Sequence, residues 1–222
     1  MRALEPGLRQ GLAALALELD DAQVGCLLDY LELIQKWTKV YNLTAVRDPA
    51  EMLTHHLLDS LAVIRPLRQQ VAQRAAPAGA PSAVRLLDVG SGAGLPGIVI
   101  AICCPDITVH CVDTVAKKAA FIQQVAVSLR LPNLRGVHAR VESLTESYDV
   151  VSSRAFASLA DFAHWSGAAL AGQGVWMAMK GKHPDDEVAA LPAGVEVFHV
   201  EQLLVPGLDA ERCIVWMRKR AA

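Results

Sequence analysis

The sequence predicts an α/β protein in which N-terminal helices precede a mostly parallel, seven-stranded sheet. From about residue 84 onward, short apolar segments typical of strands alternate with longer segments of helical periodicity. This order builds a parallel sheet with helices on both faces. The last two strand segments leave no room for a helix between them, so we expect the sheet to close with an antiparallel strand.

A glycine cluster follows the first strand segment, in the sequence LLDVGSGAGLPG at residues 86–97. The apolar runs on either side of the cluster predict a strand, a tight turn and a helix. Gly90, Gly92 and Gly94 allow positive φ angles and the close approach of a ligand, because no Cβ stands in the way. Free N–H groups at the start of the next helix attract a carboxylate or a phosphate. The segment therefore predicts a nucleotide-binding turn.

Asp88 distinguishes two classes of ligand for this turn. It stands two residues before the first glycine, where its carboxylate would repel the pyrophosphate of a dinucleotide. The same carboxylate can accept hydrogen bonds around the cationic methionine end of S-adenosylmethionine (SAM). Asp88 thus favours SAM over NAD.

Length and composition fit one α/β domain with an appended segment. The chain has 222 residues, of which 53% are hydrophobic and 20% charged, enough for a sizeable core. Charge or proline interrupts every apolar stretch before the roughly 20 residues that span a bilayer, and residues 1–20 lack a signal-peptide pattern. We expect a soluble, cytoplasmic protein with no membrane partner.

The five cysteines show no spacing typical of metal ligands. There is no C-x-x-C pair, and three of the five lie in apolar runs. We interpret them as buried, reduced thiols and expect no metal site.

Two helices are expected at the N-terminus. Leucines at helical spacing from Leu8 to Leu19 predict the first helix. Asp20 has Gln23 three residues further on, which is the pattern of a capping box. The second helix should therefore begin directly after Asp20.

A further helix should begin at the Asp48-Pro49 pair. Asp48 suits the N-cap position and Pro49 the first helical position. His55 and His56 follow on this helix, and we expect one of them to be packed and the other solvated.

Residues 75–83 are small, uncharged and interrupted by proline and glycine, which is typical of a linker. The sequence thus divides into a helical extension packed on the core (residues 1–74), this linker, and a ligand-binding domain (residues 84–222).

The ligand-binding domain should contain seven strands. The expected strand segments are residues 84–89, 107–113, 135–138, 148–152, 174–180, 195–200 and 212–217. We expect a helix that begins near Leu95, a second helix capped by Thr114, and a third over residues 157–170.

Asp113 ends the second strand, 23 residues after Gly90. At this place in a doubly wound sheet, an acidic residue can accept hydrogen bonds from both hydroxyls of a ribose. The alternative is a helix-capping aspartate.

Seven segments, in order along nearly the whole chain, carry a family resemblance. They are NLTA (42–45), His56 with DSL (59–61), DVGSGAGLPG (88–97), VD (112–113), RVE (140–142), SRAFA (153–157) and MKG (179–181). In these segments the chain resembles the bacterial small-subunit rRNA guanine-N7 methyltransferases, also called glucose-inhibited division protein B.

The resemblance implies a class I, Rossmann-like, SAM-dependent methyltransferase. Its substrate would be one guanosine of 16S rRNA, position 527 in the usual numbering, within the small ribosomal subunit. The family's cofactor residues fall on Gly90, Leu95, Val141, Glu142 and Arg154. Together with the residues discussed above, the expected cofactor site comprises Asp88, Gly90, Gly92, Gly94, Leu95, Asp113, Val141, Glu142 and Arg154. Arg154 would border both cofactor and substrate, or would form an ion pair with Glu142 or Asp88.

N7 of neutral guanine has a lone pair and no proton, so its methylation needs no general base. We therefore expect no catalytic acid or base, and a rate that depends on alignment of N7 with the methyl group.

The net charge of −2 and the pI near 6.4 argue against general polyanion binding. Local cations would have to contact the RNA, and the candidates nearest the site are Lys117, Arg140, Arg154, Lys180 and Arg212. Alternatively, Lys180 and Arg212 belong to structural ion pairs with acidic neighbours such as Asp185, Asp186, Asp209 or Glu211.

Two other functions remain open at this level. One is methylation of another RNA or of a small molecule, and the other is a noncatalytic ribosome-binding module. An NAD dehydrogenase is disfavoured by Asp88 and by the closing strand pair.

Overall fold

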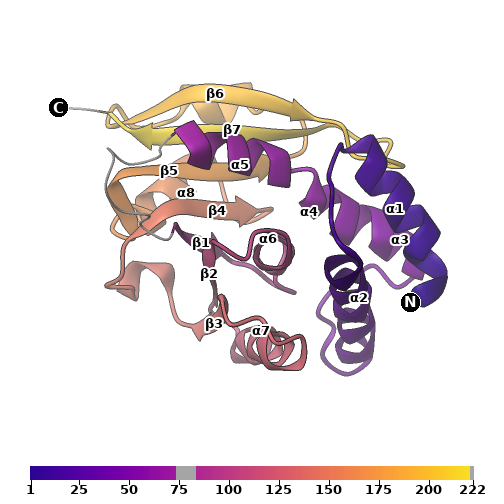
Figure 1. Cartoon of the computed structure of the whole chain (residues 1–222). Helices are drawn as coiled ribbons and strands as arrows, with labels where there is room; N and C mark the ends of the chain where they lie inside the picture. Colours follow the sequence, from indigo (N-terminus) through magenta and orange to yellow (C-terminus); the bar gives the residue numbers. More distant parts are fainter. Residues whose placement is uncertain (74–83, 221–222) are drawn as a thin grey trace.

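A computed structural model describes residues 1–73 and 84–220. The strands are β1 (Arg85–Val89), β2 (Thr108–Asp113), β3 (Leu134–His138), β4 (Tyr148–Arg154), β5 (Leu170–Lys180), β6 (Val195–Leu203) and β7 (Arg212–Lys219). Over the described residues they form one sheet in the order β3-β2-β1-β4-β5-β7-β6 (Figure 1). All seven expected strands are confirmed.

The direction of the strands also agrees with the prediction. β1 to β5 run parallel to one another, whereas β7 is antiparallel to both β5 and β6. Because β7 is reversed, Arg212 at its beginning lies at the same edge of the sheet as Lys180 at the end of β5. The carboxyl ends of β1 to β5 and the beginning of β7 therefore share one edge.

The helices between these strands are α6 (Gly97–Cys103), α7 (Ala116–Ser128), α8 (Leu159–Ser166) and α9 (Asp185–Ala189), together with a short 3-10 helix, η3 (Val141–Ser143). α6 begins two residues after Leu95. The expected cap of α7 is wrong, because Val115 occupies the N-cap position and no side chain caps this helix. α8 is shorter than predicted, since β5 already begins at Leu170.

The N-terminal part consists of η1 (Arg2–Leu4), α1 (Glu5–Ala14), α2 (Asp21–Tyr41), α3 (Pro49–Met52), the π-helix η2 (Leu53–Leu58), α4 (Asp59–Leu61) and α5 (Ile64–Gln73). Asp20 accepts a hydrogen bond from the Gln23 N–H at 2.7 Å, and the Gln23 side chain accepts one from Asp20. This capping box is confirmed. So is the Asp48 cap, which accepts hydrogen bonds from two N–H groups of α3.

The two faces of the sheet bury separate cores, because neighbouring strand residues point to opposite faces. Leu86 packs in the larger core with Ile98 of α6 and Phe121 of α7. Leu87 packs in the smaller core with Phe162 of α8. The alternation along β1 thus fixes which helices cover which face.

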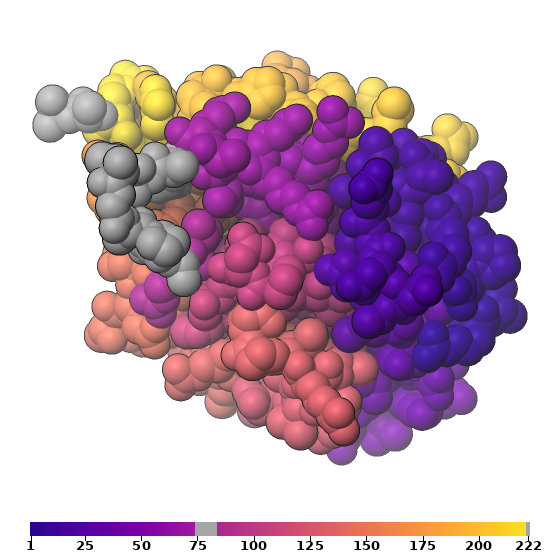
Figure 2. Space-filling view, viewed as in Figure 1, coloured from indigo at the N-terminus to yellow at the C-terminus, as the bar shows by residue number. Residues whose placement is uncertain are grey.

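The N-terminal helices share the larger core with the sheet. The buried Tyr30 of α2 donates a hydrogen bond to the Ala93 carbonyl in the glycine turn, at 2.7 Å. In Figure 2 the indigo N-terminal residues form a continuous surface with the rest of the chain. The glycine turn is therefore supported by a helix from outside the sheet domain.

The linker expected at residues 75–83 lies outside the described residues, so the division of the chain into extension, linker and domain stays a prediction. Among the helices of residues 1–73 and 84–220, none is long and apolar enough to cross a membrane.

Candidate functional site

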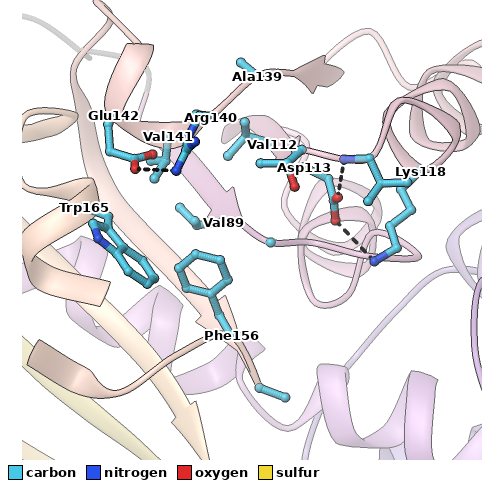
Figure 3. Close-up of a pocket in the computed structure, with 14 residues that line it drawn as sticks. Val89, Val112, Asp113, Lys118, Ala139, Arg140, Val141, Glu142, Phe156 and Trp165 are labelled. Atoms are coloured by element: carbon cyan, nitrogen blue, oxygen red, sulfur yellow. Dashed lines mark hydrogen bonds and ion pairs between the residues drawn. The ribbon is translucent and has the colours of Figure 1, made fainter. Parts of the chain in front are cut away.

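A cavity of about 410 Å³ opens at the carboxyl ends of β1, β2 and β4 (Figure 3). Its walls come from the glycine turn, the start of α7, η3 and the segment after β4. The lining residues are Val89, Gly90, Val112, Asp113, Thr114, Val115, Lys118, Ala139, Arg140, Val141, Glu142, Ala155, Phe156 and Trp165.

Some of the predicted cofactor residues line this cavity and others surround it. Gly90, Asp113, Val141 and Glu142 belong to the described lining, as does Arg140. The other predicted cofactor residues, which support the turn or border it, are Asp88, Gly92, Gly94, Leu95 and Arg154.

The three glycines of the turn all have positive φ angles, but an added Cβ would meet different surroundings at each of them. A Cβ on Gly94 would lie 2.3 Å from Ile98, and one on Gly90 would lie 2.3 Å from Phe156. A Cβ on Gly92 would have no neighbour nearer than 4.0 Å. Packing therefore requires glycine at positions 90 and 94, while Gly92 keeps a stretch of backbone open to a ligand.

Asp113 holds the glycine turn and the start of α7 together. Its carboxylate accepts hydrogen bonds from the N–H groups of Gly92 at 3.0 Å and Val115 at 2.8 Å, and Lys118 lies 3.7 Å away. A carboxylate has about four acceptor positions, so it retains capacity for two hydroxyl groups. The two roles considered for Asp113 are therefore compatible.

Asp88 lies behind the turn and is not among the described residues that line the cavity. It is fully buried and accepts hydrogen bonds from the Gly97 N–H at 3.1 Å and the Ser152 hydroxyl at 2.8 Å. Burial raises the pKa of Asp88 to about 7, although these two hydrogen bonds oppose the shift. These contacts hold the turn from behind, and the assignment of Asp88 to the cofactor site stays a prediction.

Val141 and Glu142 form the wall opposite Asp113, in the short helix η3. Val141 is buried, whereas Glu142 is exposed and pairs with Arg140 at 3.7 Å. An exposed ion pair of this kind contributes little free energy, so either side chain can turn to a ligand.

Two aromatic residues of the cavity were missed by the sequence prediction. Phe156 and Trp165 meet edge to face, with ring centroids 5.9 Å apart (Figure 3). Phe156 stands two residues after the end of β4 in a protein with only 5% aromatic residues, which was an available signal. Trp165 lies on α8, whose pattern carries no such signal.

Arg154 does form an ion pair, but its partner is neither Glu142 nor Asp88. The buried carboxylate of Asp59 bridges two arginines: Oδ2 accepts from Arg154 Nη1 and Oδ1 from Arg212 Nε, both at 2.8 Å. The arginine side chains are 21% and 26% exposed. Asp59 belongs to the DSL segment that carries the family resemblance, which implies no role for it, and the structure gives it one.

The π-helix explains a second contact of Arg154. In an α-helix, the Asp59 N–H would bond to the His55 carbonyl. Here that N–H bonds to the carbonyls of His56 and Thr54, and the His55 carbonyl instead accepts from Arg154 Nη1 at 3.0 Å. π-helical turns are frequent at functional sites.

The histidine pair divides as expected, since His55 is exposed and His56 buried. His56 Nε2 lies 3.0 Å from the Thr44 hydroxyl. Burial, together with the Arg154 cation, lowers the pKa of His56 to about 4. His56 is therefore neutral at physiological pH.

Lys180 is held by protein groups. Its Nζ donates to both carboxylate oxygens of Glu187, at 3.0 and 2.8 Å, and to the Ala157 carbonyl at 2.8 Å. Glu187 also accepts from the Leu159 N–H. For Lys180 and Arg212 the ion-pair alternative thus describes the structure, with Glu187 and Asp59 as partners in place of the acidic neighbours expected from the sequence.

The other two predicted RNA contacts are more accessible. Arg140 is 79% exposed at the cavity rim. Lys117 is exposed at the start of α7, with Nζ 5.6 Å from the ring centroid of Tyr41. No group of three or more potential metal ligands occurs within residues 1–73 and 84–220.

The cavity and the glycine turn beside it offer groups suited to the parts of SAM. A backbone stretch at Gly92 is free of side-chain obstruction, Asp113 has acceptor capacity for a ribose, and Val141, Phe156 and Trp165 offer apolar surface for a purine.

Comparison with solved structures defines the class. A SAM-dependent methyltransferase from Aquifex aeolicus is 14% identical, with a TM-score of 0.52 over 77% of this chain and 97% of that one. TrmN from Thermus thermophilus is 18% identical, with a TM-score of 0.55 over 76% of this chain and 53% of that one. The protein thus has the fold of the SAM-dependent methyltransferases.

Sequence comparison defines the family. The model of the GidB family, described as rRNA small subunit methyltransferase G, matches residues 23–215. The ribosomal RNA small subunit methyltransferase G of Albidiferax ferrireducens is 71% identical over 100% of both chains. Its counterpart in Polaromonas sp. is 69% identical over 100% of this chain and 96% of the relative. The chain belongs to the GidB family, and it is a SAM-dependent methyltransferase.

Proposed function

We propose that the protein transfers the methyl group of SAM to N7 of the guanosine at position 527 of 16S rRNA, within the small ribosomal subunit. The observation that carries this proposal is identity of up to 71%, over the full chain, with relatives named ribosomal RNA small subunit methyltransferase G. The cavity at the carboxyl ends of the strands is consistent with this activity, because doubly wound sheets bind ligands there.

The residues of the cavity have distinct parts in holding SAM. Asp113 accepts hydrogen bonds from the ribose hydroxyls, and Val141 and Glu142 flank the adenine. The open backbone at Gly92 approaches the methionine part, while Asp88, Gly94 and Leu95 keep the turn in shape. SAM supplies an activated methyl group bound to a positively charged sulfur.

Positioning is then the main task of the protein. Guanine N7 needs no deprotonation, so no residue is assigned as a general base. Holding N7 about 3 Å from the methyl carbon, in line with the sulfur, recovers several kcal/mol of the barrier. A guanine within folded RNA has to leave its stack to reach the site.

Arg154 and Arg212 suit the border between cofactor and RNA. Asp59 neutralises one of the two positive charges and fixes both guanidinium groups, so a net positive charge with unused N–H donors remains for a phosphate. Arg140 and Lys117 add accessible positive charge. We place the reaction in the cytoplasm and without a metal ion.

Mapping of N7-methylguanine in 16S rRNA tests this function. In cells that lack the gene, the modification at position 527 should be absent, and it should return when the wild-type gene is supplied. A stably folded Asp113→Asn variant should restore it poorly. An unchanged modification at position 527 in the deletion strain would contradict the proposal.

A further inference from the structure

An exposed surface beside the cavity combines an aromatic ring, apolar side chains and lysines. It is formed by the end of α2 and the start of α7, and we call it the α2–α7 platform. Its members are Lys39, Val40, Tyr41, Val115 and Lys117, all of them exposed.

The apolar part of the platform is unusual for a surface. Val40 is 69% exposed, Tyr41 44% and Val115 43%, and they belong to the few large hydrophobic side chains exposed in the described chain. Val115 also lines the cavity. Through Val115, the platform reaches the rim of the proposed methyl-transfer site.

The Tyr41 ring packs against a second aromatic ring of α2. Its ring lies 5.0 Å from that of Trp37, which in turn lies 5.3 Å from that of Phe121 in α7. These packed rings hold the end of α2 against α7, so the Tyr41 ring is already fixed in place. Stacking of a ligand on it therefore costs little side-chain conformational entropy.

The charge of the platform is positive. Lys36 and Lys118, on the same helices, are paired with Glu32 and Asp113. For Lys39 and Lys117, no ion pair with a carboxylate is found within the described part of the chain. The ammonium of Lys117 lies over the Tyr41 ring, 5.6 Å from its centroid.

We propose that the α2–α7 platform binds a single-stranded segment of the substrate RNA, with a base stacked on Tyr41 and a phosphate on Lys117. This inference rests on the proposed function and extends the RNA-binding surface to the N-terminal helices. A base stacked on an aromatic ring gains more free energy than an exposed cation over the same ring. The base therefore displaces the Lys117 ammonium, which moves to the neighbouring phosphate.

The test measures binding of the purified full-length protein to a fluorescent RNA hairpin that contains the loop around position 527, at several salt concentrations. Tyr41→Ala should weaken binding about tenfold, whereas Tyr41→Phe should stay within about twofold of wild type. Lys117→Ala should reduce the slope of log affinity against log salt by about 0.7. Arg65→Ala is the matched control, because it also removes one exposed positive charge, but from α5 and not from the platform.

SAM affinity and thermal stability, measured on the same preparations, exclude a folding defect. Equal hairpin affinity of Tyr41→Ala and wild type would overturn the inference while leaving the proposed methylation intact. A loss of binding to whole small subunits but not to protein-free 16S rRNA would show that the platform contacts a ribosomal protein, and would also overturn it. If Tyr41→Ala weakens RNA binding but wild type transfers no methyl group, the platform stands and the proposed function fails.

Discussion

Asp59 and Arg154 are separated by 95 residues, yet the Asp59 carboxylate accepts a 2.8 Å hydrogen bond from the Arg154 guanidinium. The same carboxylate binds Arg212 at the start of β7. One residue of the N-terminal helices thus orients two cations at the edge of the sheet that carries the proposed site. The N-terminal helices are part of the site's architecture.

Loss of the Asp59 charge should destabilise the protein and slow methylation. In Asp59→Asn, two largely buried guanidinium groups lose their counterion, so we expect the free energy of unfolding to fall by about 1–3 kcal/mol. Urea unfolding measures this change. Asp29→Asn removes a partly exposed carboxylate that pairs with Arg2, and it should cost less than about 1 kcal/mol. Equal urea unfolding midpoints for Asp59→Asn and Asp29→Asn would show that the Asp59 charge does not stabilise the fold.

Two glycines of the turn should respond differently to alanine. A Cβ at position 94 meets Ile98 at 2.3 Å, so Gly94→Ala should lower the melting temperature by several degrees. In Gly92→Ala the new Cβ would have no neighbour nearer than 4.0 Å. This variant should lose only about 1 kcal/mol of stability, because alanine is strained at the positive φ of this position.

SAM affinity separates the same two glycines. We expect Gly92→Ala to weaken SAM binding at least tenfold, because its Cβ enters the space used by the ligand. Calorimetry on the folded variant measures the dissociation constant. Wild-type affinity for SAM in Gly92→Ala would mean that the ligand does not approach the turn at this glycine.

Asp113→Asn should weaken SAM binding by about 1–3 kcal/mol, because the ribose loses a charged acceptor. The amide has a single accepting oxygen, so one of the two backbone N–H groups that Asp113 binds loses its partner in the variant. A cofactor analogue that lacks both ribose hydroxyls separates this effect on the turn from the loss of the ribose contact. If Asp113 holds the ribose, most of the difference between wild type and variant should disappear with this analogue, and a difference of unchanged size would assign the effect to the turn instead.

His56 should make the protein less stable in mild acid. Its pKa is about 4 in the folded state and about 6.5 in the unfolded chain. The unfolded state therefore binds more protons between these values, and stability falls as the pH drops below about 6.5. Between pH 7 and pH 5, wild type should lose about 2 kcal/mol more than His56→Gln. Urea titrations of both proteins at these two pH values test this, and parallel losses would show that His56 does not titrate in this range.

The strands and their directions were predictable because they depend on local patterns. Apolar runs, the glycine turn and the short connection before β7 are all visible along the chain. Caps such as Asp20 and Asp48 are equally local. The exception is the start of α7, which no side chain caps. Asp113, not Thr114, accepts a hydrogen bond there, from the Val115 N–H, and a sequence pattern does not distinguish two neighbouring candidates.

The residues that line the cavity were predictable only in part. Gly90 and Asp113 lie at the ends of β1 and β2, and Val141 follows β3 by three residues, so topology alone brings them together. Phe156 and Trp165 reach the cavity through the packing of α8, which no local pattern encodes.

The ion pairs were the least predictable feature. Both Arg154 and Arg212 have acidic residues nearer in the sequence, but both donate to Asp59, which is 95 and 153 residues away. A buried carboxylate that bridges two cations is a tertiary arrangement, and only the three-dimensional structure reveals it.

Direct methylation of isolated small ribosomal subunits tests the central claim. Subunits from a strain that lacks the gene would be incubated with the purified protein and SAM labelled in its methyl group, and the labelled nucleotide would be identified by mass spectrometry. We predict one methyl group per subunit, on N7 of the guanosine at position 527, and much slower formation of this product with Asp113→Asn at limiting SAM. Label on another nucleotide, or binding of subunits without any transfer, would contradict the account.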